Sequence, residues 1–204
     1  PGASPIALKL LFSPDGRILG AQAVGRDGVD KRIDVIATAL LGNMNITDLE
    51  DLELAYAPPF GSAKDPVNFA GMVAGNVLRG DTHLLHWDNL PDDAYLLDVR
   101  QPEEFEAGHL PDADLIPLGE LRNRLGELPR DRKIAVYCKV GLRGYLAERV
   151  LRQAGLDAYN VSGGWLTYKM FQNGTDNGPP AADRKGTPGV AAAQTVTGNK
   201  AAER

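Results

Sequence analysis

Short apolar segments alternate with amphipathic, helix-like segments through residues 81–172. They are, in order, strand candidates at 85–87, 95–100, 133–138 and 158–163, and helix candidates at 102–107, 119–127 and 144–154. Strands that alternate with helices predict a mostly parallel sheet covered by helices on both faces. We therefore expect a small α/β domain over residues 81–172.

Cys138, the one cysteine of the chain, lies at the end of a strand candidate and five residues before Arg143. In α/β sheets, ligand sites gather where strands end and helices begin. Backbone N–H groups of such a loop converge, and the N-terminal partial charge of the helix adds to them, so an anionic sulfur is stabilised. Gly141 permits the tight turn, and Lys139 and Arg143 add positive charge. A buried structural cysteine is the alternative interpretation, which the glycine and the two cations disfavour.

Residues 1–80 have a different pattern, with strands first and helices after them. Apolar runs at residues 6–12 and 17–24 flank the sequence Ser-Pro-Asp-Gly, which is typical of a β-hairpin turn. Helical spacing follows over residues 28–43, and Thr47 with Glu50 resembles a capping box that begins a short helix. A further helix is expected from Pro66 to a stop at Gly80. We expect an α+β domain with an antiparallel sheet and helices.

Composition narrows the possible partners and compartment. The net charge of −5 argues against nucleic acid, and no apolar run approaches the roughly 20 residues of a membrane span. A single cysteine forms no internal disulfide, so a cytoplasmic location is expected. The three histidines lack metal-ligand spacing, which predicts no metal site. Residues 173–204 have few large apolar side chains and are expected to form a disordered tail.

Three motifs, in order, resemble those of the rhodanese domain over residues 82–171: LLDVRQPEEFEAGHLPDADLIPL (96–118), the Cys138 loop, and VSGGW (161–165). The resemblance implies that Cys138 accepts sulfane sulfur as a persulfide and that Arg143 completes the loop. The six-residue loop has the sulfurtransferase length, whereas the phosphatase relatives have one residue more. The implied binding loop around the persulfide consists of Lys139, Val140, Gly141, Leu142 and Gly144.

Other residues match the rhodanese entry motif without needing to touch substrate. Asp98, Arg100, Glu104 and His109 are interpreted as supporting residues, and for Asp98 and His109 we favour a buried polar network that fixes the loop. One position departs from the family pattern. Many rhodaneses have a serine after the loop arginine, and here Gly144 follows it. The missing hydroxyl weakens the expectation of efficient turnover of free thiosulfate.

Residues 38–76, and above all the string YAPPFGSAKDPVN that begins at Tyr56, resemble the dimerisation domain of pyridine nucleotide-disulfide oxidoreductases. The similar subgroup comprises coenzyme A-disulfide reductases and related NADH oxidases or persulfide reductases, some of which carry a rhodanese domain next. The resemblance implies a homodimer through residues 1–80, with Tyr56 near the partner's flavin and redox cysteine. The alternative for Tyr56 is a packed aromatic. FAD, NAD(P)H and coenzyme A are implied for a longer parent protein, whose upstream part we expect to be missing here, since the chain has no GxGxxG fingerprint.

The leading functional hypothesis is therefore a sulfur-transfer and dimerisation portion of an FAD- and NAD(P)H-dependent disulfide or persulfide reductase. Cys138 would pass its sulfur to a small thiol such as coenzyme A, or to the flavin-linked redox cysteine. One alternative is an interaction module with a catalytically inert rhodanese-like domain. Another, a cysteine phosphatase or arsenate reductase, rests on the cysteine–arginine loop alone.

Overall fold

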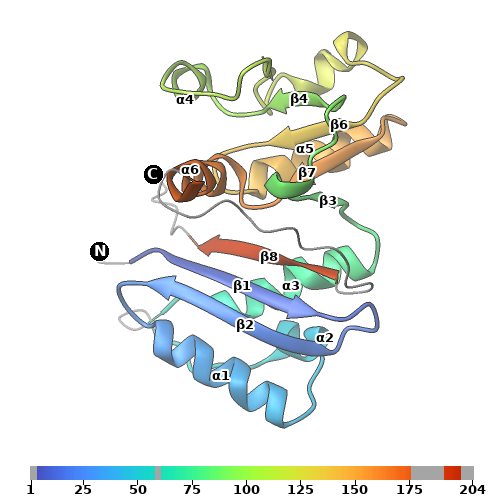
Figure 1. Ribbon diagram of the computed structural model, residues 1–204. Helices are drawn as coiled ribbons and strands as arrows, with labels where there is room; N and C mark the ends of the chain where they lie inside the picture. Colours follow the sequence, from blue (N-terminus) through green and yellow to red (C-terminus); the bar gives the residue numbers. More distant parts are fainter. Residues whose placement is uncertain (1–3, 58–60, 176–190, 199–204) are drawn as a thin grey trace. The chain divides into compact units, whose positions relative to one another are not determined.

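The computed structural model describes residues 4–57, 61–175 and 191–198 (Figure 1). The chain divides between Arg79 and Gly80 into two compact units. The first unit also includes the C-terminal strand β8 (Ala191–Gly198), and the second unit includes helix α6 (Gly164–Thr175). Among the described residues, no helix combines the length and the apolar character that crossing a bilayer requires.

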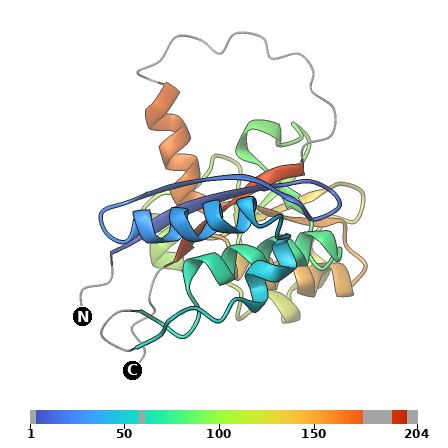
Figure 2. The same cartoon turned by 90° about the horizontal axis from the view of Figure 1, so that it is seen from below.

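The first unit is built on the hairpin that the sequence predicts. Strand β1 (Ile6–Phe12) pairs antiparallel with β2 (Ile18–Gly25). Alternate β1 side chains, from Ile6 to Phe12, are buried, so one face of the hairpin packs on the helices of the unit. Figure 2 shows these helices beside the sheet. They are α1 (Val29–Leu41), α2 (Ile46–Asp51) and α3 (Pro66–Leu78).

Helix α2 begins differently from the expected Thr47–Glu50 capping box. Asn45 is the N-cap: its Oδ1 accepts from the backbone N of Thr47 at 2.8 Å and of Asp48 at 3.1 Å. The Asp48 carboxylate in turn accepts from the backbone N of Asn45 at 2.7 Å. This reciprocal pair satisfies the free N–H groups of the first turn, so the prediction was wrong by two residues.

The expected disordered tail over residues 173–204 differs from the structure in two segments. Helix α6 continues to Thr175, and β8 pairs antiparallel with β1, which gives the sheet order β2-β1-β8. Unpaired backbone groups on the free edge of β1 accept an extended segment whatever its hydrophobicity, which composition alone does not reveal. Residues 176–190 and 199–204 of the expected tail lie outside the described residues.

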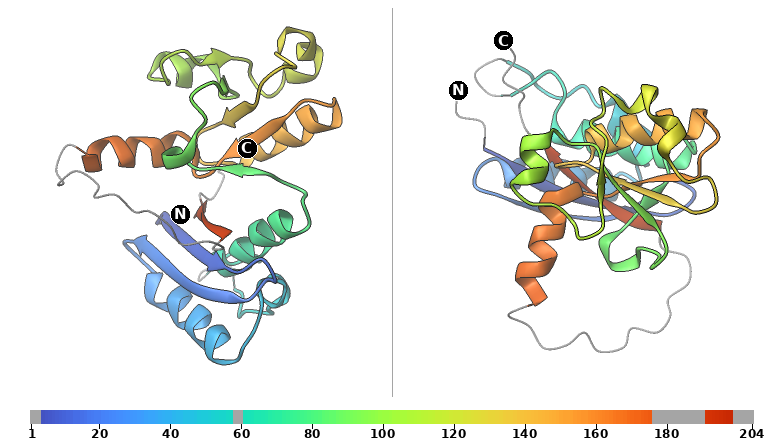
Figure 3. Two further views of the ribbon diagram at one scale, coloured as in Figure 1. Left: turned by 45° about the vertical axis from the view of Figure 1, so that its right-hand side comes forward. Right: turned by 90° about the horizontal axis from the view of Figure 1, so that it is seen from above.

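The second unit contains the mostly parallel sheet that the alternating pattern predicts. Its strand order is β3-β7-β6-β4-β5, and every neighbouring pair is parallel. Figures 1 and 3 show the sheet with helices around it. Its strands and α-helices are β3 (Leu84–Leu85), β4 (Tyr95–Asp98), α4 (Pro102–Glu106), β5 (Asp114–Leu115), β6 (Ile134–Tyr137), α5 (Leu142–Gln153), β7 (Ala158–Val161) and α6, and a 3-10 turn, η1 (Trp87–Asn89), follows β3.

Alternate side chains of β6 enter two separate cores. Ile134 and Val136 pack in one core with Leu151 of α5, whereas Tyr137 packs in the other beside Trp165 of α6. The strand is buried on both faces, which explains why it reads as a continuous apolar run.

One expectation for this unit needs correction, and one strand was not expected. The helix expected over residues 119–127 is instead a pair of short 3-10 turns, η2 (Leu121–Asn123) and η3 (Leu125–Glu127), because the interior glycine, Gly126, disfavours a continuous helix. The two-residue strand β5 was not anticipated, since its apolar content is too small to form a pattern.

Candidate functional site

Cys138 lies at the junction between β6 and α5, as the sequence predicts. Its residue surface is 1% exposed, and the loop that follows turns through Gly141, whose φ is +126°. A side chain is strained at that φ, so glycine is required there. The backbone N–H of Gly141 donates to the Cys138 Sγ at 3.1 Å. The first contact expected of an anion-stabilising loop is therefore in place.

Helix α6 holds the loop backbone from the other side. The N–H of Trp165 donates to the Cys138 carbonyl at 2.7 Å, and the N–H of Leu166 donates to the Lys139 carbonyl at 3.1 Å. A Cβ added to Gly164 would lie 2.3 Å from the Cys138 carbonyl oxygen, and Gly164 has a φ of +56°. The Ser-Gly-Gly-Trp motif thus brings a helix start close against the cysteine loop.

Arg143 is paired with Glu104. Its two terminal nitrogens donate to the two Glu104 oxygens at 2.6 and 2.8 Å, a bidentate contact between side chains that are 28% and 30% exposed. The hydrogen bond from Arg143 lowers the pKa of Glu104 to about 2. Both groups are therefore charged at neutral pH, and Glu104 offsets much of the positive charge of Arg143.

A second arginine–carboxylate pair lies inside the second unit. Arg100 donates from Nη2 to Asp98 at 2.6 Å and to the Gly108 carbonyl at 2.7 Å, and both paired side chains are at most 2% exposed. The guanidinium lies 5.0 Å from the Trp165 ring centroid. Asp98 therefore occupies the buried polar network that we expected.

His109 differs from its expected place in that network. It is exposed, its ring stacks on Phe105 at 3.7 Å between centroids, and its Nδ1 lies 2.9 Å from the Phe105 carbonyl oxygen. The contact is local to α4 and the turn after it. The prediction of a buried role for His109 was wrong, because a motif match does not show which way a side chain points.

The remaining loop residues form its rim. Lys139 is exposed, Val140 is partly buried, and the Leu142 side chain is 68% exposed at the first turn of α5. Gly144 is buried within that helix. A cation and an apolar side chain thus flank the loop on its solvent side.

Sequence reasoning missed Asn160. This β7 residue is 7% exposed, and its Nδ2 donates to the Gly141 carbonyl at 3.3 Å. A Cβ added to Gly144 would lie 2.3 Å from its Oδ1. The available signal was the polarity of Asn160, since asparagine is depleted in strands and its neighbours in AYNV are apolar.

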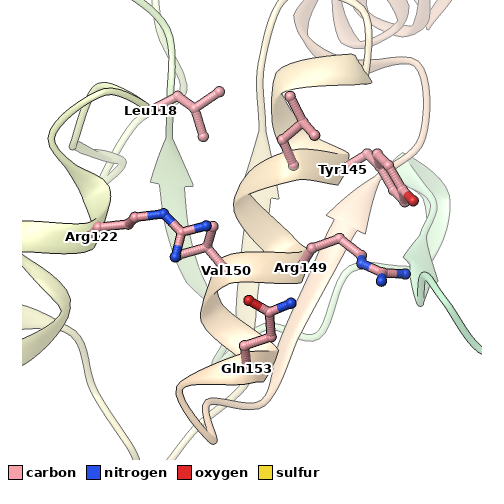
Figure 4. Close-up of a pocket in the computed structure, with 7 residues that line it drawn as sticks. Leu118, Arg122, Tyr145, Arg149, Val150 and Gln153 are labelled. Atoms are coloured by element: carbon pink, nitrogen blue, oxygen red, sulfur yellow. The ribbon is translucent and has the colours of Figure 1, made fainter.

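An open cavity of about 370 Å³ lies on the outer flank of α5. Figure 4 shows Leu118 and Arg122 across from the α5 side chains. Arg149, one of the lining residues, already contacts Asp81 at 2.8 Å. Cys138 does not line this cavity, so the reacting sulfur lies elsewhere. The lining residues are Leu118, Arg122, Tyr145, Leu146, Arg149, Val150 and Gln153.

Tyr56 belongs to the first unit, where it is 55% exposed. It precedes residues 58–60, which lie outside the described residues. Asp65, in the same irregular segment, caps α3 and pairs with Arg32 at 2.8 Å. Asp65 therefore holds this segment in place, while the role of Tyr56 stays a prediction.

Comparison with known proteins identifies the second unit. Residues 83–170 match the family model described as the rhodanese-like domain. The reduced CoADR-RHD protein of Bacillus anthracis shares 46% identity with a TM-score of 0.82, covering 85% of this chain and 32% of that one. The NAD-dependent persulfide reductase of A. fulgidus shares 42% identity with a TM-score of 0.71, covering 78% of this chain and 29% of that one.

Curated relatives are coenzyme A disulfide reductases. That of Staphylococcus epidermidis is 45% identical over 75 residues, which are 36% of this chain and 17% of the relative. That of Staphylococcus aureus is 44% identical over the same length. The match therefore spans less than a fifth of these relatives. The chain contains a rhodanese domain and is homologous to part of the coenzyme A disulfide reductase and persulfide reductase proteins.

Proposed function

We propose that Cys138 is the sulfur carrier of this chain. The observation that carries the proposal is the 3.1 Å contact from the Gly141 N–H to the Cys138 Sγ, at the base of a loop that opens α5. A thiolate there gains a hydrogen bond from the loop and the favourable field of the helix N-terminus. The rhodanese-like family match over residues 83–170 supports the same chemistry.

The transfer has two steps, neither of which needs an external oxidant. The Cys138 thiolate attacks the outer sulfur of a donor; the donor's sulfur–sulfur bond breaks, and sulfite leaves from thiosulfate or a thiolate from a persulfide. An acceptor thiolate then attacks the outer sulfur of the Cys138 persulfide. That step returns the Cys138 thiolate and leaves a persulfide on the acceptor. Lys139 at the rim attracts anionic donors.

The paired state of Arg143 favours sulfur transfer over phosphate chemistry. Glu104 accepts one N–H from each terminal nitrogen and offsets the guanidinium charge, so Arg143 attracts a doubly charged phosphate less strongly than an unpaired arginine would. The pair instead holds the start of α5 to the α4 segment, which fixes the loop around the sulfur.

As part of a longer reductase, this chain would pass sulfur to coenzyme A or to a flavin-linked cysteine. Residues 1–80 would form a homodimer, with Tyr56 facing the partner's flavin site. These roles are supported by the resemblance and by the relatives, which are a coenzyme A disulfide reductase and a persulfide reductase. FAD and NAD(P)H would be held by other parts of the longer protein, since this chain has no dinucleotide-binding fingerprint.

Mass spectrometry of the intact chain tests the carrier role. After incubation with thiosulfate, polysulfide or coenzyme A persulfide, we expect an added mass of ~32 Da that a reducing thiol removes. Cys138→Ser should abolish the adduct, and Lys139→Ala should slow its formation. A chain that forms no adduct with any of the three donors would instead be the inert interaction module.

A further inference from the structure

Asn160 has a buried amide whose two ends face different parts of the cysteine loop. The Gly141 carbonyl oxygen is an acceptor, so the amide nitrogen must face it, and the 3.3 Å contact fits that orientation. The Oδ1 then faces Gly144, where a Cβ would approach it to 2.3 Å. This oxygen is buried and has no hydrogen-bond partner within the described residues. Such a buried, unpaired acceptor is costly and calls for an explanation.

The carbonyl that Asn160 binds belongs to the peptide between Gly141 and Leu142. The same oxygen accepts from the backbone N of Tyr145 at 2.8 Å, so it is tied toward α5. In a planar trans peptide, the N–H of Leu142 points away from that oxygen. Gly141 has a φ of +126° and no Cβ, so on its side the backbone resists rotation of this peptide only weakly, and the hydrogen bonds to the carbonyl must hold it. After such a rotation, the Gly141 carbonyl oxygen would point where the Leu142 N–H points now.

We propose that Asn160 is a positioning residue that prevents this rotation. While its amide holds the Gly141 carbonyl, the Gly141 N–H donates to the sulfur of Cys138 and the carbonyl dipole of the next peptide is kept from turning toward it. An N–H donor stabilises an anion and a carbonyl oxygen destabilises it, so the hydrogen bond from Asn160 favours the thiolate form of Cys138. If Cys138 carries sulfur as proposed above, the same hydrogen bond also favours the anionic persulfide. The same amide occupies the space beside residue 144, so that position must be glycine.

The test measures the alkylation rate of Cys138 by iodoacetamide against pH, with the whole chain. Asn160→Ala removes the tie without adding a charge. We expect its rate at pH 7 to fall about threefold and the midpoint of its pH profile to rise by about 0.5 unit. Asn160→Asp places an acceptor against the Gly141 carbonyl, and its rate should fall about tenfold.

Tyr159→Phe is the matched control. It lies one residue away on β7 and loses only a hydroxyl that contacts Lys133 Nζ at 3.3 Å. Its pH profile should equal that of the unmodified chain. An unchanged midpoint in Asn160→Ala would overturn the proposal. A fall in rate without a shift in the midpoint would also overturn it, because a merely loosened loop changes access rather than the anion's stability.

A double-mutant cycle checks the geometry separately from reactivity. Gly144→Ala should lower stability by displacing the Asn160 amide, and Asn160→Ala added to it should restore much of that loss. The pH midpoint should stay raised in all three variants. Additive stability effects would contradict the assigned contact. The alkylation and stability measurements use no sulfur donor, so they test the role of Asn160 alone. Failure to form the ~32 Da adduct would contradict the carrier role of Cys138 without affecting these measurements.

Discussion

Two arginine–carboxylate pairs of the second unit differ in burial. In the inner pair, Arg100 and Asp98 are at most 2% exposed, whereas the outer pair, Arg143 and Glu104, is 28% and 30% exposed. Water screens the outer pair and is excluded from the inner one, so the two pairs contribute differently to stability although their chemical groups are the same. The inner pair should govern whether the second unit folds, and the outer pair how the loop receives its substrate.

Breaking the inner pair should have the largest effect. Asp98→Asn leaves the Arg100 guanidinium buried without its counter-charge, and we expect the free energy of unfolding to fall by about 3–5 kcal/mol. Urea unfolding followed by circular dichroism measures this. Glu127→Gln, which breaks an exposed contact to Arg124, is the control and should leave stability nearly unchanged, because water screens that pair. Similar losses in both variants would refute the contrast.

The second largest effect is expected where α6 contacts the backbone of the cysteine loop. Gly164→Ala places a Cβ 2.3 Å from the Cys138 carbonyl oxygen at a φ of +56°, so we expect a loss of about 1–3 kcal/mol and slower alkylation of Cys138. Gly126→Ala is the matched control, because a Cβ there meets no atom within 4 Å. If Gly164→Ala reacts at the unmodified rate, α6 does not position the loop.

Changing the outer pair should affect reactivity more than stability. Glu104→Gln should cost about 1 kcal/mol or less. It leaves the charge of Arg143 without an offset near Cys138, so persulfide formation from anionic thiosulfate should quicken at low salt and lose that gain at high salt. Stopped-flow rates at two ionic strengths measure the effect. Slower reaction at both strengths would mean that Glu104 acts mainly by orienting Arg143.

The smallest effect is expected in the dependence of stability on acidic pH. The pKa of Glu104 is lowered from 4.5 to about 2 in the folded chain, so its contribution to stability is present above about pH 4.5 and is lost as the pH falls through about 2. Urea unfolding of the unmodified chain and Glu104→Gln should therefore differ at pH 6 and converge toward pH 2. A constant difference across that range would contradict the charged pairing.

Local patterns predicted much of the scaffold because they follow from the chain itself. The β1–β2 hairpin needed only two apolar runs around a turn, and β6, the loop and α5 needed only an apolar strand, a glycine and a helical repeat. The capping box of α2 was misplaced because Thr47 and Asn45 are both good caps, and only the hydrogen bonds distinguish them.

The sequence by itself determined the parallel sheet of the second unit and the position of Cys138 where a strand meets a helix. The tertiary structure alone decided that Glu104 neutralises Arg143 from 39 residues away, and that Asn160 ties the Gly141 carbonyl from 19 residues away. The physical reason is range: backbone propensities act over a few neighbouring residues. A charge pair or a buried amide takes its partner from whichever strand or helix the fold brings beside it.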